Sequence, residues 1–174
     1  LKIVNVNLTP DAKANPAAVE TITDADMVVI GPGDLYTSIL PNLLVSGIAA
    51  SFRKSHGKIV YVLNLMTKFG QTYNFTARNH VEVLESIIGK SLDYVVVNTQ
   101  SLPKGALATY AKYHEIPVID DLPRDSYFRV IAVPLMSRAV YKKSSSDSLI
   151  RSLIRHNSDR LAAALTDIIG VRHA

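Results

Sequence analysis

The stretch GPGDLYTSILPNLL combines a glycine–proline–glycine turn with three consecutive hydroxyl side chains. Gly31 and Gly33 have no Cβ, so they allow a ligand to come close to the backbone. Backbone N–H groups in a glycine-rich loop, with a helix amino terminus behind them, form a concave positive site for phosphate. Tyr36, Thr37 and Ser38 place hydroxyl donors and acceptors beside it. The stretch therefore predicts a site for a phosphorylated ligand, although a tight turn explains the glycines equally well.

Polar residues also follow two later apolar runs, YVLNL and YVVVN. Asn64 lies near the end of the first run, Thr67 and Thr72 follow it, and Asn98 ends the second. The carboxyl ends of parallel strands share one edge of a sheet, and ligands bind there in the crevice where the strand order reverses. We therefore expect these side chains to converge with the hydroxyls, although Asn at a strand end often only closes a turn.

Several kinds of chemistry are excluded. The chain contains no cysteine, which removes thiol catalysis, disulfides and thiolate metal sites. Neither GxGxxG nor GxxxxGK[ST] occurs, and the five histidines lack HExxH spacing. The adjacent Asp120 and Asp121 fit a turn better than a metal pair. No metal ligand is expected, and no catalytic residue can be assigned.

The formal net charge of +4 favours an anionic partner. Lys and Arg are spread along the chain, with one doublet at Lys142 and Lys143, so we expect a small anionic ligand and no nucleic acid. No apolar run reaches the ~20 residues of a membrane span, and no signal peptide is evident. The chain is therefore expected to be soluble and cytoplasmic, without a membrane span.

Short apolar runs that alternate with helical patterns predict strands connected by helices. The expected strands are residues 1–8, 26–30, 58–65, 92–98, 116–120 and 128–135. The expected helices are residues 17–25, 41–55, 79–89, 103–115, 146–154 and 158–170. Strands that are apolar throughout indicate a parallel sheet covered on both faces. We predict a three-layer α/β fold with a mainly parallel, Rossmann-like sheet, in which residues 1–174 form a single domain.

Three motifs, GPGDLYTSILPNLL, VYVLNLMTKFGQT with TARNHV, and IRHNS, together resemble the bacterial gluconeogenesis factor family. That family is related to the 2-phospho-L-lactate transferases of deazaflavin cofactor synthesis. The resemblance implies a cytoplasmic bacterial protein that cell shape and cell-wall synthesis require during gluconeogenic growth. It implies UDP-N-acetylglucosamine as the ligand, whereas the related transferases use a guanosine-linked phospholactate donor and a divalent metal.

The resemblance also implies a longer protein. Family members have roughly twice this length and begin with a glycine-rich loop and an Asp-Asp-Gly-Gly stretch, neither of which is in this sequence. We expect the chain to be the C-terminal part of a longer one, preceded by a strand and a glycine-rich loop. No cofactor is expected in these residues. A divalent metal is expected only if the missing N-terminal part is present.

The chain departs from the family pattern at several positions. Asp34 replaces the usual serine, and Lys68 and Phe69 replace Gln and Pro. Gln71 and Asn79 replace Glu and Asp. The loss of two carboxylates weakens any assignment of a metal or a general base to this loop.

Two further residues carry over from the family motifs. Tyr110 matches the tyrosine of LxxYAxEGxxPV, although Lys112, Tyr113 and His114 depart from that pattern, and Arg155 matches the arginine of IRHD[ST]. A tyrosine can stack on a uracil, and an arginine can clamp a diphosphate. Helix packing for Tyr110 and a solvated helix start for Arg155 are the alternatives. The complete predicted ligand-binding set is Gly31, Gly33, Tyr36, Thr37, Ser38, Asn42, Asn64, Thr67, Thr72, Tyr110 and Arg155.

The sequence is compatible with three functions. The leading hypothesis is a nucleotide-sugar-binding regulator without turnover, in which ligand occupancy controls contact with cell-wall machinery. The alternative is an enzyme that transfers a phospholactyl group from a nucleotide-linked donor. The third is an unrelated phosphate-binding α/β module. The sequence leaves open a homo-oligomer and the choice between uridine and guanosine.

Overall fold

The computed structural model describes residues 3–137 and 153–170. Within them, four strands form one parallel sheet in the order β1-β2-β3-β4. The strands are β1 (Met27–Ile30), β2 (Lys58–Val62), β3 (Tyr94–Asn98) and β4 (Arg129–Val133). The strand order follows the chain without reversing, so the expected crevice at a reversal does not occur in this sheet.

The central strands are apolar on both faces. Ile59 and Tyr61 of β2 face one hydrophobic core, and Val60 and Val62 of the same strand face another. All four side chains are fully buried. A strand with apolar residues at every position needs a covering layer on each side, as expected for a buried parallel sheet.

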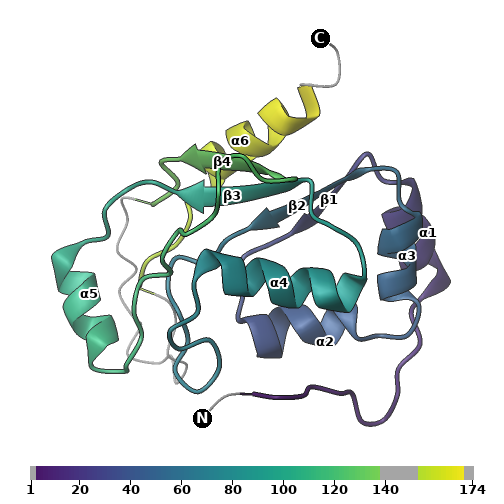
Figure 1. Ribbon diagram of the computed structural model, residues 1–174, viewed down its shortest axis with the longest axis horizontal. Helices are drawn as coiled ribbons and strands as arrows, with labels where there is room; N and C mark the ends of the chain where they lie inside the picture. Colours follow the sequence, from purple (N-terminus) through teal and green to yellow (C-terminus); the bar gives the residue numbers. More distant parts are fainter. Residues whose placement is uncertain (1–2, 138–152, 171–174) are drawn as a thin grey trace.

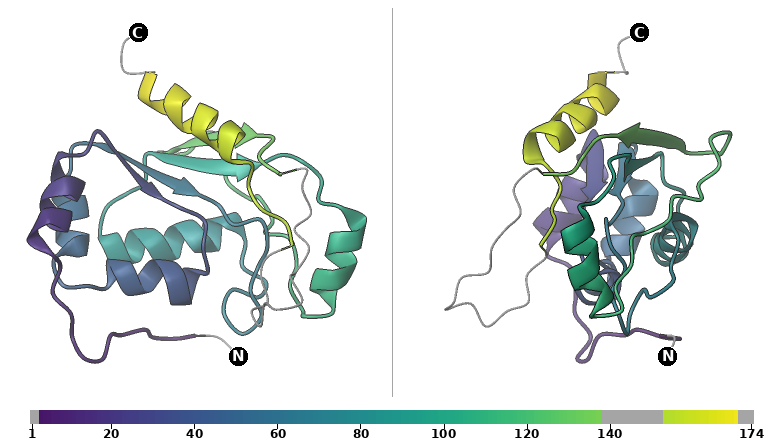
Figure 2. Two further views of the ribbon diagram at one scale, coloured as in Figure 1. Left: turned by 180° about the vertical axis from the view of Figure 1, so that it is seen from behind. Right: turned by 90° about the vertical axis from the view of Figure 1, so that its left-hand side faces the viewer.

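Helices supply both layers. The first core is closed by α2 (Leu40–Leu43), α3 (Ile48–Lys54) and α4 (Ala77–Ile88), and the second by α6 (Ser158–Gly170). Figure 1 shows α6 on one side of the sheet and α2 with α4 on the other, and Figure 2 shows the same layers from behind and from the side. The three-layer α/β prediction is confirmed.

The remaining two α-helices lie at the ends of these layers (Figure 1), and Ile22 from the first of them packs against the first core. α1 (Pro16–Asp24) packs against α3, and α5 (Lys104–Ala111) forms a small third core with Ile154. None of the described helices is both long and apolar enough to cross a membrane.

Local sequence signals set the ends of these helices. Asn15 accepts a hydrogen bond from the backbone N–H of Ala17 at 3.0 Å and caps α1. Thr76 and Asn79 form a capping box at the start of α4. Gly89 ends α4 with φ of 65°, a left-handed conformation that glycine adopts without strain.

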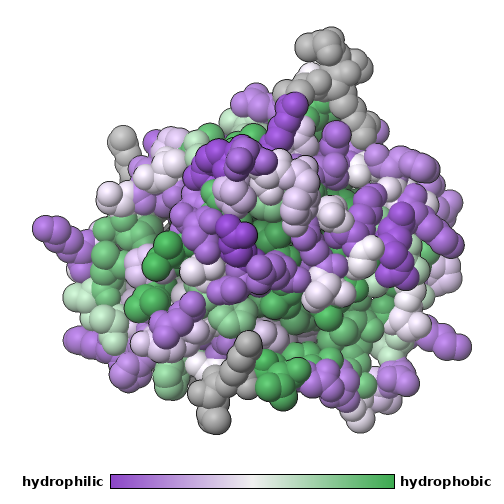
Figure 3. Space-filling model, viewed as in Figure 1, coloured by the Kyte–Doolittle hydropathy of each residue, from purple (hydrophilic) through white to green (hydrophobic). Residues whose placement is uncertain are grey.

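Two predicted strands are wrong. Residues 3–8 form no strand but run past α2 and α4, where Val4 is 92% exposed. Figure 3 shows apolar residues gathered along this lower edge of the molecule. Residues 116–120 make only isolated bridges, from Met66 to Pro117 and from Thr76 to Ile119, because Pro117 cannot donate to a ladder.

One predicted helix is divided in the structure, and another lies mostly outside the described residues. The helix expected at residues 41–55 is divided into α2 and α3, because the chain turns at Gly47 with φ of 105°. It is preceded by a π-helix, η1 (Leu35–Ile39), which was not predicted. Most of the helix expected at residues 146–154 lies outside the described residues.

The packing around Gly57 gives a test of the fold. A Cβ at Gly57 would overlap the carbonyl oxygen of Ala25 and lie 2.8 Å from the carbonyl carbon of Asp26. We expect Gly57→Ala to lower the free energy of unfolding by at least about 2 kcal/mol, the scale of an overpacked core.

The matched control is Gly105→Ala, because a Cβ at this position in α5 meets nothing within 4 Å. Urea unfolding should show it to be neutral or stabilising by up to about 1 kcal/mol. Equal effects of the two substitutions would contradict the close approach of Gly57 to the backbone before β1.

Candidate functional site

A polar cleft of about 790 Å³ lies where the loops after β1 and β2 meet two later segments of the chain. Six predicted ligand-binding residues line it: Gly33, Ser38, Asn64, Thr67, Tyr110 and Arg155. It is also lined by Asp34, Lys68, Glu115 and His156, which are not among the predicted ligand-binding residues. The structure therefore joins the three motifs in one site.

Asn64 connects the first two loops. Its side-chain oxygen accepts a hydrogen bond from the Gly33 N–H at 3.1 Å, and its amide nitrogen donates to the Gly33 carbonyl at 2.7 Å. The Gly33 N–H therefore already has a partner within the protein, which corrects the expectation that this loop would offer it to phosphate. The described glycines with left-handed φ are Gly47, Gly70 and Gly89, so Gly33 is not needed for that conformation.

The packing at Gly33 explains the residue in another way. A Cβ at Gly33 would lie 3.3 Å from the Cβ of Ser38, which is closer than ordinary contact. Glycine lets the loop fold tightly against the start of η1. Both Ser38 N–H and Ile39 N–H donate to the Asp34 carbonyl, at 2.8 and 3.2 Å. The bond from Ile39, like that from the Leu40 N–H to the Leu35 carbonyl, spans five residues and so defines a π-helical turn, a feature that is frequent at functional sites.

Two predicted threonines serve mainly as loop anchors. Thr67 is 1% exposed, and its hydroxyl accepts from the Ile116 N–H at 3.1 Å. Thr72 is also 1% exposed, and its hydroxyl accepts from the Lys68 N–H at 2.9 Å. Both bonds satisfy backbone donors; the Thr67 bond holds the loop after β2 against the chain that follows α5, and the Thr72 bond closes the loop on itself.

Tyr110 and the segment around Arg155 close the far side of the cleft. The Tyr110 hydroxyl accepts from the N–H groups of Leu153 and Ile154, at 2.9 and 3.4 Å. Tyr110 is 8% exposed, which favours a packing role for its ring. The carbonyl of Arg155 accepts from the Ser137 N–H at 2.8 Å, so the backbone of this motif is fixed beside the end of β4.

Charged groups of both signs meet in the cleft. Lys68 and Glu115 form an ion pair of 2.7 Å, and Asp34 and Arg155 also line the site. The hydrogen bond to Glu115 raises the pKa of Lys68, so the ammonium stays charged. Because Lys68 is partly exposed, solvent screens this pair and its contribution to stability is small.

His156 is the least expected group at the site. Its Nε2 atom is buried and makes no hydrogen bond in the described structure. Burial lowers the pKa of His156, so its imidazole is neutral near pH 7. A neutral imidazole beside Arg155 adds a polar group without adding charge.

The other predicted ligand residues lie away from this cleft. Gly31 and Thr37 are exposed, and Thr72 is buried in its loop. Asn42 donates from Nδ2 to the Ser38 carbonyl at 2.7 Å, a bond within the helical segment. Asn98 does not converge with the site either, because its side-chain oxygen accepts from the Leu135 N–H at 3.0 Å.

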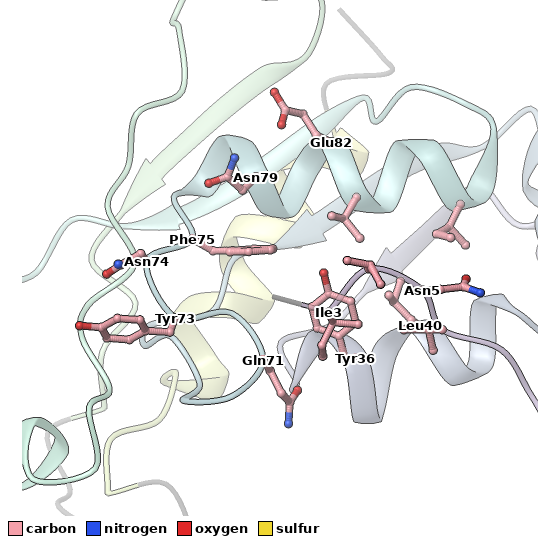
Figure 4. A pocket seen from close by; sticks show the side chains of 14 residues that line it. Ile3, Asn5, Tyr36, Leu40, Gln71, Tyr73, Asn74, Phe75, Asn79 and Glu82 are labelled. Atoms are coloured by element: carbon pink, nitrogen blue, oxygen red, sulfur yellow. The ribbon is translucent and has the colours of Figure 1, made fainter. Parts of the chain in front are cut away.

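Tyr36 points into a second pocket of about 560 Å³. Figure 4 shows its ring near Phe75 between the N-terminal segment and α4. The two rings meet edge to face, with centroids 6.4 Å apart. Burial raises the pKa of Tyr36. The three consecutive hydroxyls therefore diverge: Ser38 faces the cleft, Tyr36 faces this pocket, and Thr37 faces solvent.

The sequence indicated some of the cleft residues that were absent from the predicted ligand-binding set, but not all of them. Lys68 and His156 are neighbours of the predicted Thr67 and Arg155, so their proximity to the site was visible. Glu115 carried no signal, because its partner Lys68 is 47 positions away in the chain. Among residues 3–137 and 153–170, no three His, Asp or Glu side chains are grouped so that they could hold a metal ion.

The anchoring role of Thr72 can be tested against Thr37. Thr72→Val keeps the side-chain shape but leaves the Lys68 N–H without its acceptor. We expect a loss of about 1 to 3 kcal/mol in the free energy of unfolding, the cost of an unsatisfied buried donor.

Thr37→Val is the control, because Thr37 is exposed and should change stability by less than about 0.5 kcal/mol. Denaturant unfolding of both variants measures the difference. A Thr72→Val protein as stable as the wild type would show that the loop does not depend on this hydroxyl.

The chain matches known proteins over most of its length. The family described as 2-phospho-L-lactate transferase CofD matches residues 1–136. The gluconeogenesis factor of Bacillus subtilis is 32% identical over 170 residues, which cover 97% of this chain and 51% of that protein. The gluconeogenesis factor of Halalkalibacterium halodurans is 35% identical over 168 residues, which cover 95% of this chain and 49% of the relative.

A solved structure agrees with these relationships. The crystal structure of a protein from Bacillus halodurans has a TM-score of 0.81 and 34% sequence identity, covering 94% of this chain and 51% of that one. The chain thus spans about half the length of the relatives that it matches. The chain belongs to the gluconeogenesis factor family, which is related to 2-phospho-L-lactate transferase CofD.

Proposed function

We propose that the chain is part of a cytoplasmic regulator that binds a nucleotide sugar, with UDP-N-acetylglucosamine as the ligand, and acts in cell shape and cell-wall synthesis during gluconeogenic growth. The observation that carries the proposal is the convergence of all three sequence motifs on one polar cleft. The identity of the sugar nucleotide and the cellular role rest on the family resemblance.

The chemistry of the cleft suits a ligand with a charged centre and polar ends. Arg155 and Lys68 supply cationic donors, and an arginine can contact phosphate oxygens with two parallel hydrogen bonds. Ser38 and His156 offer neutral polar groups nearby. A diphosphate would replace Glu115 as the partner of Lys68, or it would bind Lys68 together with Glu115. Both partners can bind at once because an ammonium group has three donors.

Asp34 and Glu115 impose selectivity on this site. Two carboxylates in the same cleft oppose a highly charged anion, while they accept hydrogen bonds from sugar hydroxyls. A diphosphate that carries a sugar therefore fits better than free pyrophosphate. Because the cleft holds charges of both signs, the overall net charge of +4 adds little to the attraction between the cleft and an anionic ligand.

A second function has one observation in its favour. The family match that covers residues 1–136 is named for a transferase, and Asp34, Glu115 and His156 lie in the cleft as groups that can move protons. In this alternative the chain contributes to an enzyme that transfers a phospholactyl group from a guanosine-linked donor. Ligand selectivity separates the two functions.

Thermal unfolding with two nucleotides tests the choice. We expect UDP-N-acetylglucosamine to raise the Tm of the full chain more than guanosine diphosphate does. Binding to the native state alone adds about 2.7 kcal/mol when the ligand is at a hundredfold excess over Kd. For a chain of this size that corresponds to a shift of about 5 to 10 °C. A larger shift with guanosine diphosphate would favour the transferase.

Arg155 provides the residue-level test. Arg155→Ala should weaken binding of UDP-N-acetylglucosamine by roughly 2 to 3 kcal/mol, the range for hydrogen bonds to charged groups. Arg155→Lys should recover only part of this loss, because lysine keeps the charge but not the planar fork. Calorimetric titration gives the affinities, and ligand-free Tm values show whether the fold is intact.

The control is Arg129→Ala, which removes the same charge from an exposed position on β4 outside the cleft. It should leave the affinity unchanged. If Arg155→Ala binds as tightly as the wild type, Arg155 does not contact the ligand. If Arg155→Ala mainly lowers the ligand-free Tm, its role is structural.

A further inference from the structure

Phe69 contacts two other aromatic rings, those of His114 and of Tyr73, and Tyr73 also lines the second pocket. The rings of Phe69 and His114 have centroids 5.1 Å apart with planes inclined by 39°. Phe69 also meets Tyr73 edge to face, with centroids 6.2 Å apart. Phe69 is 58% exposed and Tyr73 is 45% exposed. Single exposed apolar residues are ordinary, but exposed rings gathered in one place mark a contact surface.

The backbone holds this cluster in a costly conformation. His114 has φ of 56°, in the left-handed region that residues with a Cβ seldom adopt. Asn74 has φ of 63° at the end of the neighbouring loop. Glycine would serve at the position of His114 without strain, so the fold alone does not explain an imidazole there.

The ring pair belongs to the same two segments as the charged part of the cleft. Phe69 follows Lys68 in the chain, and His114 precedes Glu115. The 2.7 Å ion pair between Lys68 and Glu115 joins the same two segments that the rings join. Lys68 and Glu115 line the cleft, so each ring is next in the chain to a residue of the lining.

We propose that Phe69 and His114 form a stacking platform for the planar base of a nucleotide whose phosphates bind in the cleft. This inference rests on the proposed function and adds the site of the base. A flat heterocycle laid on the outer face of Phe69 removes apolar surface from water and gains from ring stacking. His114 supports Phe69 from the side and offers ring nitrogens to polar groups at the edge of the base.

The test uses two probes that differ by the nucleoside. UDP-N-acetylglucosamine carries a base, and N-acetylglucosamine 1-phosphate does not. The variants are Phe69→Ala, which removes an exposed ring, and His114→Gly, in which glycine adopts the same φ without strain and so preserves the fold. Ile169→Ala on α6, where Ile169 is 45% exposed, controls for loss of an exposed apolar side chain. Calorimetric titration of the full chain measures each affinity.

We expect each platform variant to bind UDP-N-acetylglucosamine at least about fivefold more weakly than the wild type, the lower limit for loss of a stacked base. Binding of N-acetylglucosamine 1-phosphate should be unchanged, and Ile169→Ala should match the wild type with both probes. Variants that bind the nucleotide sugar normally would overturn the platform and leave the proposed function standing.

Two other outcomes would also contradict the stacking platform. Equal losses for both probes would overturn the platform, because they would show that the rings act by shaping the loop. A wild-type chain that binds neither probe would overturn the proposed function and the platform with it.

Discussion

The paired hydrogen bonds between Asn64 and the backbone of Gly33 are the constraint on which the site depends. They join the loop after β1 to the loop after β2 with distances of 3.1 and 2.7 Å. Each loop leaves the parallel sheet at the end of its strand. The amide satisfies one donor and one acceptor of the Gly33 backbone, which would otherwise be left unpaired beside the core. The two loops therefore form one wall of the cleft.

The same bonds decide which groups remain for a ligand. The Gly33 N–H is taken, and the hydroxyls of Thr67 and Thr72 already accept backbone donors. The groups that suit an anion are instead the long cationic side chains of Lys68 and Arg155, which both line the cleft. Polar residues near a ligand site thus divide into those that build the walls and those that face inward.

The sequence predicted the larger features well because they follow from local patterns. The four strands of the sheet are short apolar runs, and α1, α4 and α6 have cap residues or amphipathic spacing that act within a few positions. The strand expected at residues 1–8 failed for the opposite reason. An alternating apolar pattern predicts a strand only when a partner lies beside it, and residues 3–8 have none in the described structure. Similarly, Pro117 prevents residues 116–120 from pairing as a strand.

The candidate site shows where local information ends. By itself the sequence determined that GPG, the run after β2 and IRHN lie at the ends of elements, since strand and helix boundaries depend on neighbouring residues. Only the tertiary structure decided which side chain faces where. Tyr36, Thr37 and Ser38 are consecutive, yet the turn of η1 sends them to a pocket, to solvent and to the cleft. Lys68 meets Glu115 across 47 positions because the chain after α5 returns to the loop after β2, and contacts at that separation follow from packing of the whole domain rather than from any local pattern.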